Sequence, residues 1–119
     1  MTTRKEERRA IAEERWPLLS RVLSGYFHQD YAEVHGSVDG ALAQAISDAS
    51  LAHKQTLLKQ WWNWNQTEGA TDDIRRLLND GFGIALHFKK PIDARNFMNG
   101  IYDGFIRSVR QEAGKDWKP

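Results

Sequence analysis

The chain reads Tyr26-Phe27-His28-Gln29-Asp30-Tyr31 within its first third, and Gly36-Ser37 follow shortly afterwards. An amphipathic helix would separate apolar from polar residues at a regular spacing, which this run does not do. The run instead favours a structural corner between two helices, with aromatic rings filling a small core and the Gln29 and Asp30 side chains bonding exposed backbone groups. The alternative, an acid/base pair of His28 and Asp30, fits the spacing of no catalytic or metal motif.

Two helices are predicted before this corner. Thr3-Arg4-Lys5-Glu6 has the form of a capping box, and Arg9 with Glu13 has the i, i+4 spacing of an ion pair, so residues 1–15 are expected to form a polar helix. Trp16 marks a joint, because Pro17 suits the first turn of a new helix and cannot continue the old one. The second helix should run to about Gly25 and bury an apolar stripe made of Leu18, Leu19, Val22, Leu23 and Phe27.

Two further helices are predicted after the corner. Ser37 is expected to cap the first of them, with Asp39 in its first turn, where a carboxylate suits the helix dipole. The apolar stripe then continues at helical spacing through Leu42, Ile46, Ala49, His53, Leu57, Trp61 and Trp64. Ser47, Asp48 and Ser50 lie together in the middle of this stripe, and because these residue types prefer caps to helix interiors, we expect two helices with a break near Ser50.

The C-terminal half is predicted to hold a short helix, an irregular segment and a long helix. Thr71, Asp72 and Asp73 should start the short helix, which Gly81 ends as a C-cap residue. The segment 82–88 is compatible with a short buried strand or with a packed loop. The last helix is expected from about Asp93 to Ala113, with Phe97, Ile101, Phe105 and Val109 facing the core.

Glycines and element order complete the predicted architecture. Gly100 and Gly104 lower helix stability, so both suggest close approach to a neighbouring helix. We expect a mainly α, single-domain bundle of about five to six helices, divided into the polar helix 1–15, a helical domain 16–113 and a tail 114–119.

Composition excludes several classes of protein. One hundred and nineteen residues, of which 40% are hydrophobic and 28% charged, are typical of one soluble domain. The absence of cysteine excludes a disulfide framework, an iron–sulfur cluster and a thiol nucleophile. No apolar run approaches the ~20 residues of a membrane-spanning helix, and the first residues do not form a signal peptide. We therefore expect a cytoplasmic protein without a membrane partner.

Charge is unevenly distributed along the chain. The net charge of +1 argues against a protein held on nucleic acid by many phosphate contacts. Residues 22–53 contain no Lys or Arg but four acidic residues, namely Asp30, Glu33, Asp39 and Asp48. Such a segment can attract a basic partner, although carboxylates that merely cap helices and face solvent would give the same pattern.

No enzyme motif is present. The chain lacks a phosphate-binding glycine loop, a nucleophile elbow and an HExxH sequence. The four histidines, His28, His35, His53 and His87, share no metal-ligand spacing with acidic residues. We therefore expect neither catalysis nor a cofactor or metal.

The run Trp61-Trp62-Asn63-Trp64 is the second unusual feature. On a helix Trp62 is rotated by about 100° from Trp61, so one of the three rings is expected to face outward. An exposed Trp can anchor a protein interface or stack a nucleobase. The alternative is that neighbouring helices cover all three rings.

Several of these motifs resemble a family of immunity proteins from bacterial contact-dependent growth inhibition systems. In that family an aromatic-Pro pair opens a helix, Tyr-Phe-His-Gln-Asp and a further aromatic residue end it, and Gly-Ser starts the next helix. Here the matching residues are Trp16-Pro17, Leu23, the run 26–31, Gly36-Ser37 and Ala41-Leu42. The resemblance covers about residues 16–106 and weakens after Ser50, where Leu51 replaces a frequent Pro and Gly81-Phe82-Gly83 replaces a common Gly-Cys and tyrosines.

The resemblance implies a non-enzymatic inhibitor that forms a 1:1 complex with the toxic C-terminal domain of a surface-delivered effector, commonly a nuclease. An acidic stretch suits the basic cleft of such a toxin. Candidate contacts are Tyr31, Glu33, Asp39, Asp48, Trp62, Asp72 and Asp73, whereas Tyr26, Phe27, His28, Gln29, Asp30, Gly36 and Ser37 are assigned to the structural corner. The competing interpretation is a small helical nucleic-acid-binding module that uses residues 4–15, Lys54, Lys59 and the Trp cluster.

Overall fold

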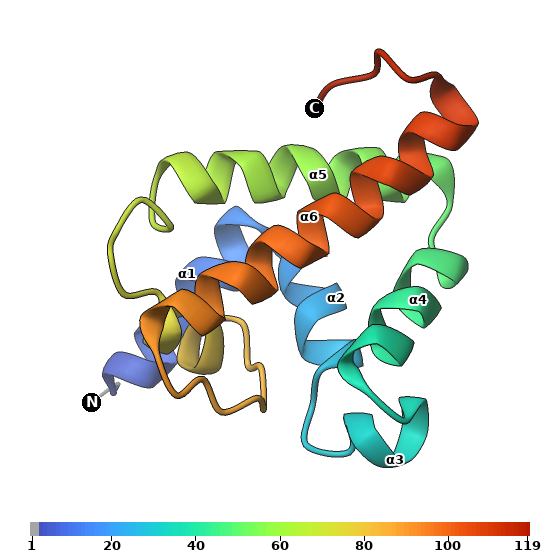
Figure 1. Cartoon of the computed structure of the whole chain (residues 1–119). Helices are drawn as coiled ribbons and strands as arrows, with labels where there is room; N and C mark the ends of the chain where they lie inside the picture. The colour runs from blue at the N-terminus through green and yellow to red at the C-terminus, as the bar shows by residue number, and fades with distance from the viewer. Residues whose placement is uncertain (1–2) are drawn as a thin grey trace.

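Helices make up most of the computed structural model, which describes residues 3–119 (Figure 1). Along the chain they are α1 (Arg4–Arg15), α2 (Pro17–Tyr26), α3 (Tyr31–His35), α4 (Val38–Asp48), α5 (Leu51–Gln66), the π-helix η1 (Leu77–Gly81) and α6 (Pro91–Ala113). Helix α6 crosses the molecule and packs on α5 and α4, while α1 packs on α2 and η1. Residues 3–119 contain no strand, so the predicted mainly α single domain is confirmed.

The predicted capping residues stand at the starts of α1, α4 and α5. Glu6 N–H donates to Thr3 Oγ1, and Thr3 N–H donates to Glu6 Oε2, both at 3.1 Å, which completes the capping box. Ser37 Oγ accepts from Gly40 N–H at 3.0 Å, and Ser50 Oγ accepts from His53 N–H at 3.2 Å. The break between α4 and α5 is therefore confirmed. Met1 and Thr2, which the predicted first helix included, lie outside the described residues.

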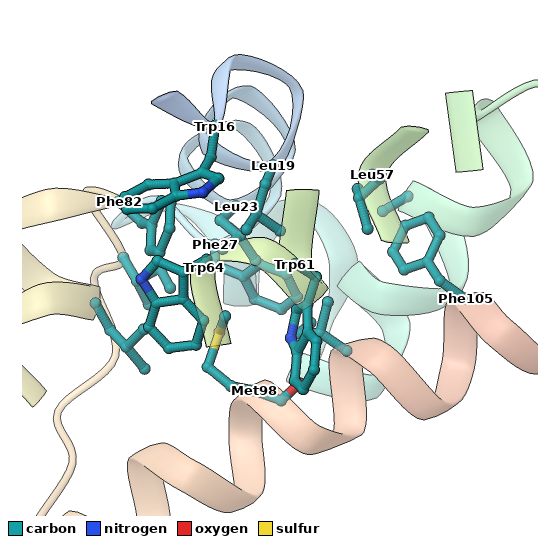
Figure 2. Close-up of a cluster of buried hydrophobic side chains, with 14 of the residues drawn as sticks. Trp16, Leu19, Leu23, Phe27, Leu57, Trp61, Trp64, Phe82, Met98 and Phe105 are labelled. Atoms are coloured by element: carbon teal, nitrogen blue, oxygen red, sulfur yellow. The ribbon is translucent and has the colours of Figure 1, made fainter. Parts of the chain in front are cut away.

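Aromatic rings from distant segments form the centre of the core (Figure 2). Phe82 lies between Trp16 at the α1–α2 joint, with ring centroids 6.3 Å apart, and Trp64 of α5, at 5.7 Å. Trp61 packs against Tyr102 of α6 at 4.6 Å, and its Nε1–H donates to Met98 O at 3.0 Å. Since burial of each large apolar side chain contributes about 1.5–3 kcal/mol, these contacts hold α1, α5 and α6 together.

Two polar side chains of α5 fix the start of α2. Gln60 Oε1 accepts from Leu18 N–H at 2.9 Å and from Leu19 N–H at 3.0 Å. Asn63 Oδ1 accepts from Trp16 Nε1–H at 2.9 Å. The first N–H groups of a helix have no intrahelical acceptor, so Gln60 supplies from another helix the cap that Trp16 lacks. No local sequence pattern indicates this contact.

The segment before η1 differs from the prediction. Thr71, Asp72 and Asp73 lie in a loop, and the helical turn begins only at Arg75, whose N–H donates to Asp73 Oδ1 at 3.1 Å. Gly81 is not a C-cap residue but the last residue of the π-helix, because Phe82 N–H donates five residues back to Leu77 O at 3.1 Å. The wider turn therefore includes Gly81, and Phe82 is the C-cap residue.

The segment 82–88 is a packed loop, which decides between the two predicted alternatives. Asn79 Nδ2 donates to Ile84 O at 2.9 Å and to Leu86 O at 2.7 Å, and Ala85 N–H donates to Phe27 O at 2.8 Å. The loop thus obtains from η1 and from the end of α2 the hydrogen bonds that a sheet would supply.

Helix α6 begins at Pro91, slightly earlier than the predicted Asp93, and Lys90 N–H donates to Asp93 Oδ2 at 3.2 Å. Of the predicted core residues, Ile101, Phe105 and Val109 are buried and Phe97 is half-buried. The expected close approach is correct for Gly104, where an added Cβ would lie 3.1 Å from Leu42 and Ile46 of α4. It is wrong for Gly100, where an added Cβ would meet nothing within 4 Å.

This difference between two glycines of one helix gives a matched stability test. Gly100→Ala should stabilise the protein by about 0.5–1 kcal/mol, because alanine restricts the unfolded chain and finds open space in the fold. Gly104→Ala should be the less stable of the two variants, because its methyl group must displace the Leu42 and Ile46 side chains. Urea unfolding followed by circular dichroism measures both free energies. Equal gains at the two positions would contradict the tight α4–α6 contact.

Candidate interaction surface

The segment from Tyr26 to Ser37 joins α2 to α4 through the short helix α3. Phe27 is buried, and its ring meets Phe97 of α6 edge to face at a centroid distance of 5.0 Å. Gly36 ends α3 with φ +82°, a conformation that favours glycine, and its N–H donates to Ala32 O at 2.9 Å. The Gly36-Ser37 pair therefore ends one helix and caps the next.

The hydrogen bonds inside this corner differ from those expected. His28 Nδ1 accepts from Asp30 N–H at 3.0 Å, so the imidazole ring bonds the exposed backbone group. Asp30 makes no side-chain capping bond to α3, and both Gln29 and Asp30 are exposed. The predicted backbone-bonding role of Asp30 is therefore wrong. Within residues 3–119 the His28 and Asp30 side chains form neither a hydrogen bond nor an ion pair with each other, so the geometry supplies no acid/base pair.

A cluster of Tyr26, His35 and Asp48 connects α2, α3 and α4. The Tyr26 hydroxyl donates to Asp48 Oδ2 at 2.5 Å, and the Tyr26 and His35 rings lie 5.7 Å apart at an angle of 31°. Gln44 Nε2 donates to Asp48 Oδ1 at 2.7 Å. Burial and the bond to Asp48 raise the pKa of Tyr26 to about 12, while the bonds from Tyr26 and Gln44 lower the pKa of Asp48. Asp48 is thus a charged acceptor at neutral pH.

Three of the seven predicted contact residues lie in α3 or in the first turn of α4, which packs against it. Glu33 and Asp39 are exposed, Tyr31 is half-buried, and Val34 beside them is 63% exposed. We call these four residues, Tyr31, Glu33, Val34 and Asp39, the acidic corner. Helix α3 packs mainly against α4 and lies at one end of the molecule (Figure 1). An exposed apolar side chain flanked by acidic groups has the composition of a protein-binding surface for a basic partner.

The remaining candidates lie elsewhere. Asp72 and Asp73 are in the loop between α5 and η1, on the opposite side from α3 in Figure 1. Asp73 is paired with Arg75, with Nη2 and Oδ2 2.8 Å apart, and the hydrogen bonds from Arg75 lower its pKa to about 2. Asp48 is the last residue of α4. It is connected to α3 through Tyr26, which bonds Asp48 and contacts His35.

Trp62 is the outward-facing ring of the Trp run. It is 45% exposed, whereas Trp61 and Trp64 are buried, so the prediction that one of the three faces outward is confirmed. Its ring lies 6.3 Å from that of Tyr102. The two rings line a cavity of about 300 Å³ together with Arg110 and Lys118. This aromatic and basic site is separate from the acidic corner.

The structure changes the candidate nucleic-acid surface. Lys54 is buried, and its Nζ lies 2.6 Å from Glu112 Oε2 and 2.8 Å from Ser108 Oγ of α6. This lysine therefore ties α5 to α6 and does not face a phosphate. On α1, Arg8 pairs with Asp80 at 3.2 Å and Arg9 with Glu13 at 2.8 Å. Lys54 was predicted to belong to a basic surface because the two residues that bind it lie more than fifty positions away in the chain.

A metal centre is not apparent in the described part of the chain. No group of three His, Cys, Asp or Glu side chains in residues 3–119 could hold a metal ion. Over the same residues, no helix has the length and apolar character needed to cross a bilayer. The surface features described so far are the acidic corner, the Trp62 site and the exposed ends of the helices.

Comparison with known proteins gives one finding. The family model described as "CdiI immunity protein" matches residues 15–105, which include the corner, the Trp run and most of α6. Neither a curated protein nor a solved structure shows a significant match to the chain. The matched range leaves out nearly all of α1 and the last residues of α6.

The hydrogen bond inside the corner predicts unequal effects of two substitutions. His28→Ala should lower the free energy of unfolding by about 1 kcal/mol, because it removes the acceptor of Asp30 N–H. Asp30→Ala should have a smaller effect, because its carboxylate caps nothing. Chemical denaturation of both variants measures the difference. A larger loss for Asp30→Ala would mean that the carboxylate, and not the imidazole, holds the corner.

The Tyr26–Asp48 bond predicts a pH-dependent effect of Tyr26→Phe. Asp48 has a folded pKa below its ordinary 3.8, so its contribution is present above that pH and is lost as pH falls through the folded pKa. Tyr26 has its pKa raised from 10.0 to about 12, so its contribution is lost as pH rises between those values. The difference in Tm between wild type and Tyr26→Phe should therefore be greatest near neutral pH. Tyr31→Phe is the control, and a Tyr26→Phe effect that persists unchanged into strong acid would contradict the assignment.

Proposed function

The chain belongs to the CdiI immunity protein family, and from this we propose that it binds and neutralises the C-terminal toxin domain of a contact-dependent growth inhibition effector. The observation that carries the proposal is the family match over residues 15–105. In this proposal the protein acts in the cytoplasm as a stoichiometric inhibitor in a 1:1 complex, without catalysis and without a cofactor. The toxin is a nuclease whose substrate-binding cleft carries basic side chains.

The acidic corner is the proposed main contact with the toxin. Glu33 and Asp39 are exposed, and neither forms an ion pair within residues 3–119, although Arg107 of α6 lines the same surface hollow as Asp39. Their field would guide a basic toxin surface toward α3, and Val34 and Tyr31 would then lose water in the complex. Contact through Asp48 extends this surface along α4. Trp62, Asp72 and Asp73 lie on other faces of the protein, so they would contribute only if the toxin also covers those faces.

A protein that covers a cleft needs a rigid support behind its contact residues. Phe27, packed on Phe97 and bonded through its carbonyl to Ala85, fixes the chain immediately before α3. Gly36 and Ser37 fix the chain immediately after it. We propose that the motif of residues 26–37 builds this support, while the exposed side chains of α3 and α4 select the toxin.

A second candidate function is supported by the Trp62 site. Two aromatic rings beside Arg110 and Lys118 could stack a base and neutralise a phosphate. The chain's net charge of +1 and the burial of Lys54 favour the toxin-binding proposal over this one. Binding of mixed-sequence RNA or DNA that weakens steeply with salt would support the second candidate.

The proposal is tested with the toxin domain encoded beside this chain. Mixing the two purified proteins should give a 1:1 complex and abolish toxicity. The double variant Glu33→Gln/Asp39→Asn should slow association and weaken the complex by about tenfold at low salt, because two charges that guide encounter are removed. Stopped-flow kinetics and calorimetry measure both effects.

The matched control is Glu14→Gln/Asp116→Asn, which removes the same charge from exposed residues on α1 and in the tail. This control should bind the toxin at close to the wild-type rate. Full toxicity in the presence of excess wild-type protein would disprove the inhibitor function. Equal slowing by both double variants would leave the function intact but remove the acidic corner as the contact.

A further inference from the structure

A pocket of about 180 Å³ opens between α2, α4 and α5, and none of its floor was singled out by the sequence as a site. Leu18 and Val22 of α2 and Leu57 of α5 form two of its sides. The side chains of Ala45 and Ala49 form the third, at the end of α4. The pocket therefore has an apolar floor built from three helices, which hold it in shape by their own packing.

The pocket stays open for two reasons. Alanine side chains on α4 are too short to reach α2 and α5, so the helices meet without filling the space between Ala45, Ala49 and Leu57. The Tyr26 ring is held in the lining of the pocket by its hydrogen bond to Asp48 and by its contact with His35. The same cluster that connects α3 to α4 thus forms one wall of the pocket.

The size and lining of the pocket define what would fit. An apolar cavity of about 150 Å³ is large enough for a benzene ring in other proteins, so this pocket has room for one aromatic or branched aliphatic side chain. The polar residues of the lining are Asp48, Arg21 and His53, together with Tyr26. Asp48 is exposed, and each of its carboxylate oxygens, which already accepts one bond from Tyr26 or Gln44, can accept a second from a basic group next to the apolar side chain.

We propose that this pocket is the anchor site of the toxin complex and receives one apolar side chain, aromatic or branched aliphatic, that a basic residue flanks on the toxin surface. This inference rests on the proposed function and assigns it a second contact. The pocket is connected to α3, because Tyr26 lines it and its ring contacts His35 of α3. A toxin guided to α3 by charge would meet the pocket next to it, and buried apolar anchors carry most of the binding energy in protein interfaces.

The experiment tests whether a larger side chain placed in the pocket prevents toxin binding. Ala49→Leu places a larger side chain into it at a half-buried position just after α4. The matched control is Ala52→Leu, the same substitution at an exposed position in the first turn of α5 and outside the pocket. We expect Ala49→Leu to weaken toxin binding by about tenfold or more at unchanged Tm, and Ala52→Leu to bind as the wild type does. Calorimetric titration with the purified toxin domain measures both.

The outcomes separate this inference from the proposed function. If wild type and Ala49→Leu bind the toxin equally well, no side chain enters the pocket and the inference is overturned, while the inhibitor function stands. If the wild type itself does not bind, the proposed function fails. Should Ala49→Leu lower the Tm, Val22→Phe fills the pocket from α2 and is judged by the same comparison. A wild-type dimer that Ala49→Leu dissociates would assign the pocket to a second copy of the chain and overturn the inference.

Discussion

The structure depends on the hydrogen bonds from Leu18 and Leu19 to Gln60, which fix the first turn of α2 on the side of α5. A buried N–H group without an acceptor costs about 1–3 kcal/mol, so α2 cannot slide along α5 without losing two such bonds. The position of α2 on α5 then determines where the residues at its two ends lie. Trp16 comes to rest on Phe82, and Phe27 reaches Phe97 and the loop 82–88.

The parts of the chain that build the fold and the parts proposed to bind the toxin are separated in space. Aromatic packing among Trp16, Trp64 and Phe82 lies at one end of α2, and the acidic corner follows its other end. Residues of α3 can therefore vary without disturbing the core, provided that Phe27 and Gly36 keep their positions. This separation suits a protein whose partner must be distinguished from related toxins.

Local rules predicted much of the helix pattern and little of the tertiary detail. The caps at Thr3, Ser37 and Ser50 and the joint at Pro17 depend on neighbours in sequence, and their residue types indicated them. Gln60 and Lys54 acquired their roles from partners that are distant in the chain. Their residue types are ordinary for an exposed helix face, so no sequence signal marked them.

The same limit applied to the candidate site. Charge patterning selected Glu33 and Asp39, but it also selected Asp73, whose neighbour Arg75 neutralises it. The exposure of Val34 and the gap left by Ala45 and Ala49 arise only when helices are placed side by side. The π-helix was missed because Gly81 has the residue type of a helix end, while the contact with α1 favours continuing the turn.

Helix α1 lies almost entirely outside the family-matched residues, yet it constrains a position inside them. Gly83 has φ +67°, a conformation that favours glycine, and a Cβ added there would displace the end of the flexible Arg9 side chain. Arg8 adds an ion pair to Asp80 of η1. The N-terminal helix and the segment 80–83 therefore pack as one unit. A chimera with another family member would have to exchange both together, because either one alone would meet a surface shaped for a different partner.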